Sequence, residues 1–433
     1  MDEFIGLIGF IAALILIILR VPVAVAMGAV GIIGTIPLMG WDTTHYILST
    51  APFEAVFPYS LSVIPLFVLM GVFAAHAGLS RNLYTGVNAF IGHFRGGLAM
   101  ATVGACAAFG AICGSSLATV ATMSKVAMPE MRKHGYPDSL AAASVAAGGT
   151  LGVLIPPSII MVIYALLTEQ SVGALFSAAL LPSLLAISLY LLAVVAQQHF
   201  LSEESSTPAL SWAARKQALL KIWDVVLLFS VVMGGIYTGF FSPTEAAAVG
   251  ALGAFLFTWL RGKLTWQVFK LCVQETADIT GMLFLILIGA ALFNFFIESS
   301  NLPTTLLTWL QSQGFTPLTV MICIVVFYLI LGCFMDSLSM ILLTVPFIFP
   351  VVTSMGYDPI WFGILLVTVV ELGLITPPIG MNLFIIQGVI PDLSLRTVMR
   401  GIIPFIFADG VRIILLIAFP SIALWLPTVM KMM

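Results

Sequence analysis

Charged residues are scarce in this chain, and their scarcity excludes most classes of protein at once. Only 8% of the 433 residues are Asp, Glu, Lys or Arg, against about 25% in a typical soluble domain. Hydrophobic residues make up 61% of the chain, and they gather in uncharged runs on the scale of a membrane helix, which needs about 20 apolar residues. The composition therefore predicts an all-α polytopic integral membrane protein.

The features that would indicate nucleic-acid binding, metal binding, secretion or catalysis are also missing. The net charge is −3 and no polybasic run is present. The five cysteines lie in apolar sequence without Cys-x-x-Cys spacing, so they predict buried thiols. The acidic N-terminus does not resemble a cleaved signal peptide. No His-Glu-x-x-His or Gly-x-Ser-x-Gly motif occurs, so neither an enzyme nor a bound cofactor is predicted.

One carboxylate stands out because it interrupts apolar sequence. Asp336 lies between the uncharged runs Val320–Leu331 and Met340–Phe349. A charge at the centre of a bilayer costs roughly 2.5–3.5 kcal/mol on insertion scales, so it usually faces protein, water or an ion. Two roles stay open for Asp336: a carboxylate in or beside a cation site, or carrying a proton, and the N-cap of a helix that begins at a hairpin tip.

The chain contains an internal duplication at a constant offset of 221 residues (337 − 116 = 221). The matched pairs are Ser116 and Ser337, Pro129 and Pro350, Gly135-Tyr136 and Gly356-Tyr357, and the double prolines Pro156-Pro157 and Pro377-Pro378. Repeats with matching Pro and Gly breaks are typical of secondary transporters. In each repeat we expect a helical hairpin followed by a helix that breaks at the double proline, since proline removes a backbone donor.

Several apolar segments are too short to cross a bilayer, which favours half-helices and re-entrant hairpins. We expect four parts: N-terminal scaffold helices at 1–51, a first repeat at 52–200 with a hairpin at 97–131, a linker with scaffold helices at 201–275, and a second repeat at 276–433 with a hairpin at 317–352.

The breaks predict a binding site. Backbone carbonyls freed by an unwound turn must be satisfied by protein, water or a cation, and half-helix N-termini favour a carboxylate. The hard oxygen atoms there suit Na⁺, with these candidate residues: Gly114, Ser115, Ser116, Gly152, Pro156, Asp336, Ser337, Gly373, Thr376 and Pro377. The candidates for substrate binding are Ser116, Ser158, Ser337 and Asn382. Ser115 and Ser116 are equally compatible with close helix packing.

Other polar residues leave alternatives open. Glu371 faces the site, supports a residue that does, or lies at the membrane interface. Asn382 either contacts substrate or satisfies freed backbone groups. Asp409 and Arg412 are three residues apart and are expected to pair on one helix. Lys125 interrupts an apolar segment of the first hairpin, where it either snorkels or attracts an anion.

Three motifs resemble the large membrane subunit of TRAP transporters, the DctM-like family. They are Phe241-Ser-Pro-Thr-Glu-Ala-Ala-Ala-Val-Gly250, Ile155-Pro-Pro-Ser-Ile159 and Gly332-Cys-Phe-Met-Asp-Ser337. The resemblance implies an elevator-type fold with two inverted repeats. It also implies import of an organic acid, commonly a C4-dicarboxylate, driven by a Na⁺ gradient across a bacterial inner membrane. The implied partners are a small four-helix membrane subunit, as a separate chain, and a periplasmic binding protein.

One position departs from the family pattern. Relatives of the sialic-acid branch often carry an Asp shortly after the first-hairpin serines, where this chain has Thr119.

The alternative function is an ion or organic-anion carrier or channel of related fold that works without a binding protein.

Overall fold

The computed structural model describes residues 2–201 and 210–432, which form twenty α-helices and one short 3-10 helix and contain no strand. Seven of these helices are long and apolar enough to cross a membrane, or up to nine when each bent pair is one span. The prediction of an all-α polytopic membrane protein is therefore confirmed. Residues 202–209 of the expected linker lie outside the described residues.

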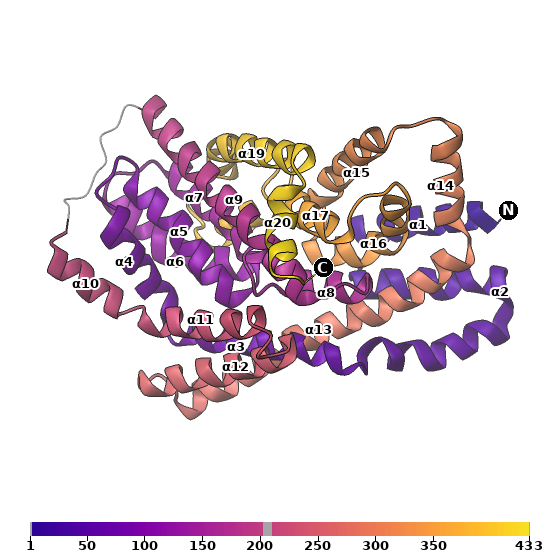
Figure 1. Ribbon diagram of the computed structural model, residues 1–433, viewed down its shortest axis with the longest axis horizontal. Helices are drawn as coiled ribbons and strands as arrows, with labels where there is room; N and C mark the ends of the chain where they lie inside the picture. The colour runs from indigo at the N-terminus through magenta and orange to yellow at the C-terminus, as the bar shows by residue number, and fades with distance from the viewer. Residues whose placement is uncertain (1, 202–209, 433) are drawn as a thin grey trace.

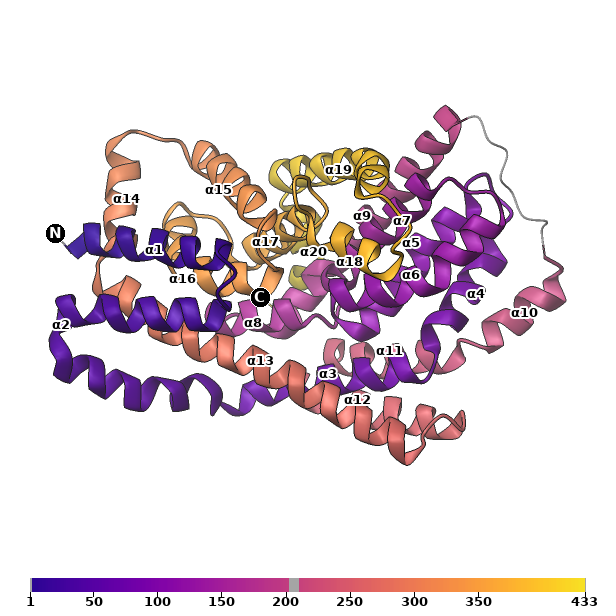
Figure 2. The same cartoon turned by 180° about the vertical axis from the view of Figure 1, so that it is seen from behind.

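A layer of scaffold helices runs along one side of the molecule. Helices α2 and α13 lie side by side there in both views (Figures 1 and 2). Pro22 precedes α2 and separates it from α1, because its fixed φ suits the position before a helix. The scaffold helices are α1 (Asp2–Ile18), α2 (Val23–Val56), α10 (Trp212–Leu220), α11 (Trp223–Tyr237), α12 (Pro243–Leu260) and α13 (Trp266–Ser299).

The duplication is present in three dimensions. The first repeat contains η1 (Tyr59–Ser62), α3 (Val63–His76), α4 (Leu79–Ile91), α5 (Gly97–Cys113), α6 (Ser116–Lys133), α7 (Asp138–Leu154), α8 (Ile159–Leu167) and α9 (Val172–Leu201). The second contains α14 (Leu302–Ser312), α15 (Pro317–Gly332), α16 (Ser337–Ser354), α17 (Pro359–Gly373), α18 (Met381–Val389), α19 (Leu395–Ala418) and α20 (Ser421–Val429). Helices α5 and α6 form the first expected hairpin, and α15 and α16 form the second.

Two of the expected domain boundaries fall inside helices. The boundary between residues 51 and 52 lies within α2, and the boundary between residues 275 and 276 lies within α13. Each of these helices therefore passes from the scaffold directly into a repeat. Helix α2 tolerates Pro37 and Pro52 but is interrupted at Gly40, whose backbone is not helical (φ +81°), and it doubles back on itself along its length (Figure 2).

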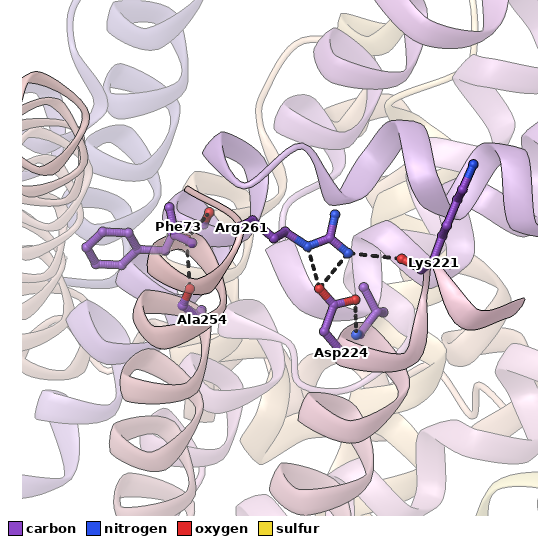
Figure 3. Close-up of polar contacts among 7 residues, drawn as sticks. Phe73, Lys221, Asp224, Ala254 and Arg261 are labelled. Carbon is purple, nitrogen blue, oxygen red and sulfur yellow. Dashed lines mark hydrogen bonds and ion pairs between the residues drawn. The ribbon is translucent and has the colours of Figure 1, made fainter. Parts of the chain in front are cut away.

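Helices α11 and α12 are held together by an ion pair at their polar end (Figure 3). Arg261 Nε donates to Asp224 Oδ2 at 2.7 Å, and the same guanidinium donates to the Lys221 carbonyl at 2.9 Å. The Asp224 side chain is only 2% exposed. Three residues before Arg261, about one helical turn back in α12, Thr258 Oγ1 donates to the Phe73 carbonyl of α3 at 3.2 Å. These contacts fasten the α11–α12 pair to the start of the first repeat.

Replacing Arg261 by Met should destabilise this corner by about 1–3 kcal/mol, because the buried Asp224 carboxylate would lose its charged partner. The thermal midpoint of the purified protein should fall. Lys263→Met is the matched control, since Lys263 is exposed two residues further along the chain. An equal fall in both variants would contradict this role of Arg261.

Candidate functional site

Both hairpin tips open onto a single cavity of about 150 Å³. The first tip contributes Gly114–Leu117 and the second contributes Asp336–Leu338. Residues next to the two helix breaks complete the repeat side, and α13 closes the opposite side. The expectation that the two tips and two breaks lie together is therefore correct in its geometry. Asp336 is the cavity's one charged lining residue among those described, and none is basic.

The first tip is a tight reversal between α5 and α6. Gly114 ends α5 with a φ of +64°, a left-handed conformation that a residue without Cβ adopts at no steric cost. The Ser115 hydroxyl caps α6 by accepting a hydrogen bond from the Ala118 amide at 3.4 Å. Thr119, at the position that departs from the family pattern, donates its hydroxyl to the Ser115 carbonyl at 2.7 Å. Its side chain therefore stabilises the tip.

The second tip is organised by Asp336, which caps α16. One carboxylate oxygen accepts from the Ser339 amide at 3.1 Å, and the other accepts from the Ser339 hydroxyl at 2.5 Å. The capping role left open by the sequence is therefore observed. Because Asp336 is also partly exposed and lines the cavity, this geometry is compatible with a second role at the cavity surface.

The two broken helices lie behind the tips. Helices α7 and α8 are bent by 42° at their break, and both double prolines contain a cis peptide bond. Ser158 caps α8 by accepting from the Met161 amide at 3.4 Å and is fully buried. Five of the site residues expected from the sequence line the cavity: Gly114, Ser115, Ser116, Asp336 and Ser337. The expected residues that do not line it are Gly152, Pro156, Ser158, Gly373, Thr376, Pro377 and Asn382.

Two buried polar side chains of the second broken helix hold the tip serines. The Ser337 hydroxyl donates to Glu371 Oε1 at 2.7 Å. Asn382 Nδ2 donates to Ser116 Oγ at 3.0 Å and to the Ala146 carbonyl at 3.3 Å. Glu371 and Asn382 are 1% and 0% exposed. The structure thus favours a supporting role for both over direct contact with substrate in this conformation.

The sequence did not identify the side of the cavity that α13 forms. Ile279, Met282 and Leu283 of α13 line it, and nothing distinguishes them from other apolar residues of a membrane helix. Lys125, for which the sequence left snorkelling and attraction of an anion open, is exposed on α6 and does not line this cavity.

A second buried polar cluster lies on α19, behind the first broken helix. Asp409 Oδ1 and Arg412 Nη2 are 2.9 Å apart, which confirms the expected pair on one helix. Tyr190 of α9 donates to Asp409 Oδ2 at 2.7 Å and lies 3.0 Å from the Thr150 hydroxyl. Thr150 occupies the position in the first repeat that Glu371 occupies in the second (371 − 150 = 221). The two repeats therefore use this position for different contacts.

Two hairpins and two broken helices around a shared cavity are the architecture of a membrane carrier. The chain is similar in fold to a solved transporter, YdaH of Alcanivorax borkumensis, with a TM-score of 0.63, 14% identity, and coverage of 89% of this chain and 90% of that one. Residues 10–422 match the family model "Tripartite ATP-independent periplasmic transporter, DctM component". The chain belongs to this family, as the sequence motifs indicated.

Curated relatives agree with this assignment. The C4-dicarboxylate TRAP transporter large permease protein DctM of Pseudomonas aeruginosa is 37% identical over 380 residues, covering 87% of this chain and 88% of the relative. The ectoine TRAP transporter large permease protein TeaC of Halomonas elongata is 32% identical, covering 95% of this chain and 96% of the relative. These relatives are transporter permeases and not enzymes. This chain is therefore the large permease of a tripartite transporter.

Proposed function

We propose that this permease imports an organic acid, of which a C4-dicarboxylate is the first candidate, driven by a Na⁺ gradient. A periplasmic binding protein delivers the acid, and a small four-helix subunit completes the membrane part in a bacterial inner membrane. The relative named for C4-dicarboxylates supports this substrate class. Another relative is named for ectoine, so the substrate differs among relatives.

The observation that carries the proposal is the charge of the cavity. Asp336 is the acidic residue of the lining, and no basic side chain is among the described residues that line the cavity. A dicarboxylate entering alone would bring more negative charge into a low-dielectric site, where charges interact more strongly than in water. Entry of an anion together with cations removes this cost, so the lining favours a cation symporter.

The residues at the tips fit a cation such as Na⁺. Serine hydroxyls and the Asp336 carboxyl group at the cavity surface supply hard oxygen atoms. Behind them, Glu371 Oε2 is buried without a hydrogen-bond partner among the residues that the structure describes. A bound cation would supply positive charge against the carboxylates of the acid and of Asp336. The chain's own contribution is to hold the two tips at fixed positions around the cavity.

Transport further requires the cavity to face each side of the membrane in turn. We propose that the hairpins and broken helices move together against the scaffold layer of α2 and α13, as in an elevator. This division is supported by the cavity itself, because its repeat side comes from the tips and breaks and its opposite side comes from α13.

Asp336→Asn should reduce Na⁺-dependent uptake at least tenfold while leaving the protein folded. Asparagine caps a helix about as well as aspartate, so the substitution removes charge and keeps the cap. Asp358→Asn is the matched control, because Asp358 caps α17 through the Ile360 and Trp361 amides at 2.8 and 2.9 Å. Uptake of a radiolabelled C4-dicarboxylate by proteoliposomes, with the binding protein present, measures the effect.

The same assay tests the proposed function. A saturable flux that requires both a Na⁺ gradient and the binding protein supports it. Flux without a binding protein would favour the alternative carrier, and an ohmic current would favour a channel. Unchanged Na⁺ dependence in Asp336→Asn would contradict the role of this carboxylate.

A further inference from the structure

The two hairpin tips are held by the same element, although they belong to different repeats. Ser337, at the second tip, donates to Glu371 at the end of α17. Ser116, at the first tip, accepts from Asn382 at the start of α18. Both partners therefore belong to the second broken helix, and Asn382 reaches across from one repeat to the other.

The first broken helix does not make the equivalent contacts. Its residues at the matched positions are Thr150 and Met161. Thr150 lies against the Tyr190 hydroxyl, away from the tips. Met161 has an apolar side chain, and its amide donates to the Ser158 cap. The two repeats therefore have similar backbones, but the side chains that hold both tip serines come from the second broken helix.

The segment that joins the two partners is short and conformationally restricted. Glu371 and Asn382 are separated by the end of α17 and the connection to α18, in which Pro377 and Pro378 have φ fixed by their rings. The Asn382 amide donates back to the Leu374 carbonyl at 3.1 Å, which closes the connection on itself. We therefore expect a displacement of one partner to shift the other.

Burial makes these four hydrogen-bonding side chains costly to separate from their partners. All four side chains are at most 5% exposed, so each hydrogen bond lies in a low-dielectric interior where an unmatched polar group is costly. Ser116 also lies within interaction range of the Glu371 carboxyl group. A single shift of the second broken helix thus changes the polar partners of both tips.

We propose that Glu371 and Asn382 are positioning residues that couple the two hairpin tips, so that a change at one tip alters the other. The proposal rests on the proposed function only in taking the tips as the binding site. A substrate or ion that orders one tip would then favour the ordered form of the second, which is positive coupling between the two halves. Coupling free energies of this kind correspond to about 5–150-fold effects.

Amide hydrogen exchange on the full permease, co-expressed with its small subunit and without added Na⁺ or substrate, tests the coupling. Asn382→Ala removes the contacts to Ser116 and to the Ala146 carbonyl, and it leaves the Glu371–Ser337 contact of the second tip in place. The proposal expects exchange to accelerate at least about fivefold at the second tip, Met335–Ser339, as well as at Gly114–Leu117. Acceleration confined to the first tip would overturn it.

Two further variants keep the test decisive. If Asn382→Ala does not fold, Asn382→Leu removes the same polar contact while keeping side-chain volume and is judged by the same criterion. Ser124→Ala is the matched control, because Ser124 is a buried serine on the same helix whose hydroxyl donates to its own helix, to the Val120 carbonyl at 2.6 Å. Acceleration at the second tip in Ser124→Ala too would indicate general loosening and overturn the proposal.

The Na⁺ activation of uptake gives an independent readout. Where uptake rises sigmoidally with Na⁺ in the unmodified protein, Asn382→Ala should bring the Hill coefficient toward one, and an unchanged coefficient would count against the coupling. Uptake that does not depend on Na⁺ would instead refute the proposed driving ion, and hydrogen exchange would still decide whether the tips are coupled.

Discussion

Arg412→Met is expected to lower the stability of the protein by about 3–5 kcal/mol, because it leaves the Asp409 carboxylate buried and unpaired. Both side chains are essentially inaccessible, at 1% and 0% exposure. Tyr190 still donates to Asp409 at 2.7 Å, but one neutral donor does not replace a guanidinium. The yield of folded protein and its thermal midpoint in detergent measure the loss.

A double variant separates the charge from the packing. Replacing a buried pair by apolar residues of similar volume is often neutral, so Asp409→Leu combined with Arg412→Met should recover much of the stability lost in Arg412→Met. Arg400→Met, at an exposed position of the same helix, should have little effect. A double variant no more stable than the single one would show that Arg412 acts through packing alone.

The second large effect is expected at the crossing of α15 and α17, where two glycines meet. A Cβ atom on Gly373 would lie 2.6 Å from Gly332 Cα and 2.9 Å from Gly332 C, so the backbones would have to separate. Overpacking of this kind costs about 1–3 kcal/mol. Gly373→Ala should therefore displace the second hairpin and abolish most uptake, even where the protein still inserts and purifies.

Comparison within the duplication sharpens this prediction. At the matched crossing of α5 and α7, a Cβ on Gly152 would lie 3.0 Å from both Gly110 Cα and Thr119 Oγ1. Gly152→Ala should therefore be milder than Gly373→Ala. Gly388→Ala on α18 meets no atom within 4 Å and is the control. The reverse ranking of the two crossing variants in the uptake assay would contradict this account.

The glycine pairs also change the interpretation of two residues that the sequence suggested as cation ligands. Gly152 and Gly373 lie at helix crossings behind the cavity and do not line it. Sequence reasoning selected them because they precede the double prolines. Close approach of two helix backbones gives an equally strong reason for a residue without a side chain, and only the paired positions on the neighbouring helices reveal it.

Much of this protein was determined by the sequence itself. The apolar composition required a membrane protein, because so few charges cannot cover a soluble surface. The constant offset between Ser116 and Ser337 required two similar frames, and the double prolines required broken helices, since proline cannot continue the hydrogen-bonding pattern. The hairpins, breaks and the pairing of Asp409 with Arg412 follow from such local rules.

Tertiary structure alone decided which side chains meet. Glu371 and Asn382 are separated from the tip serines they hold by 34 and 266 residues, and no local pattern encodes those distances. The asymmetry between the repeats arises in the same way. Thr150 and Glu371 occupy matched places, yet Thr150 lies beside Tyr190 and Glu371 beside Ser337. Asp336 is prominent in the sequence as a lone carboxylate, and in the structure it caps α16. It is also the one charged residue among the described residues that line the cavity. This second property depends on tertiary structure, because the cavity forms only where the two tips and α13 come together.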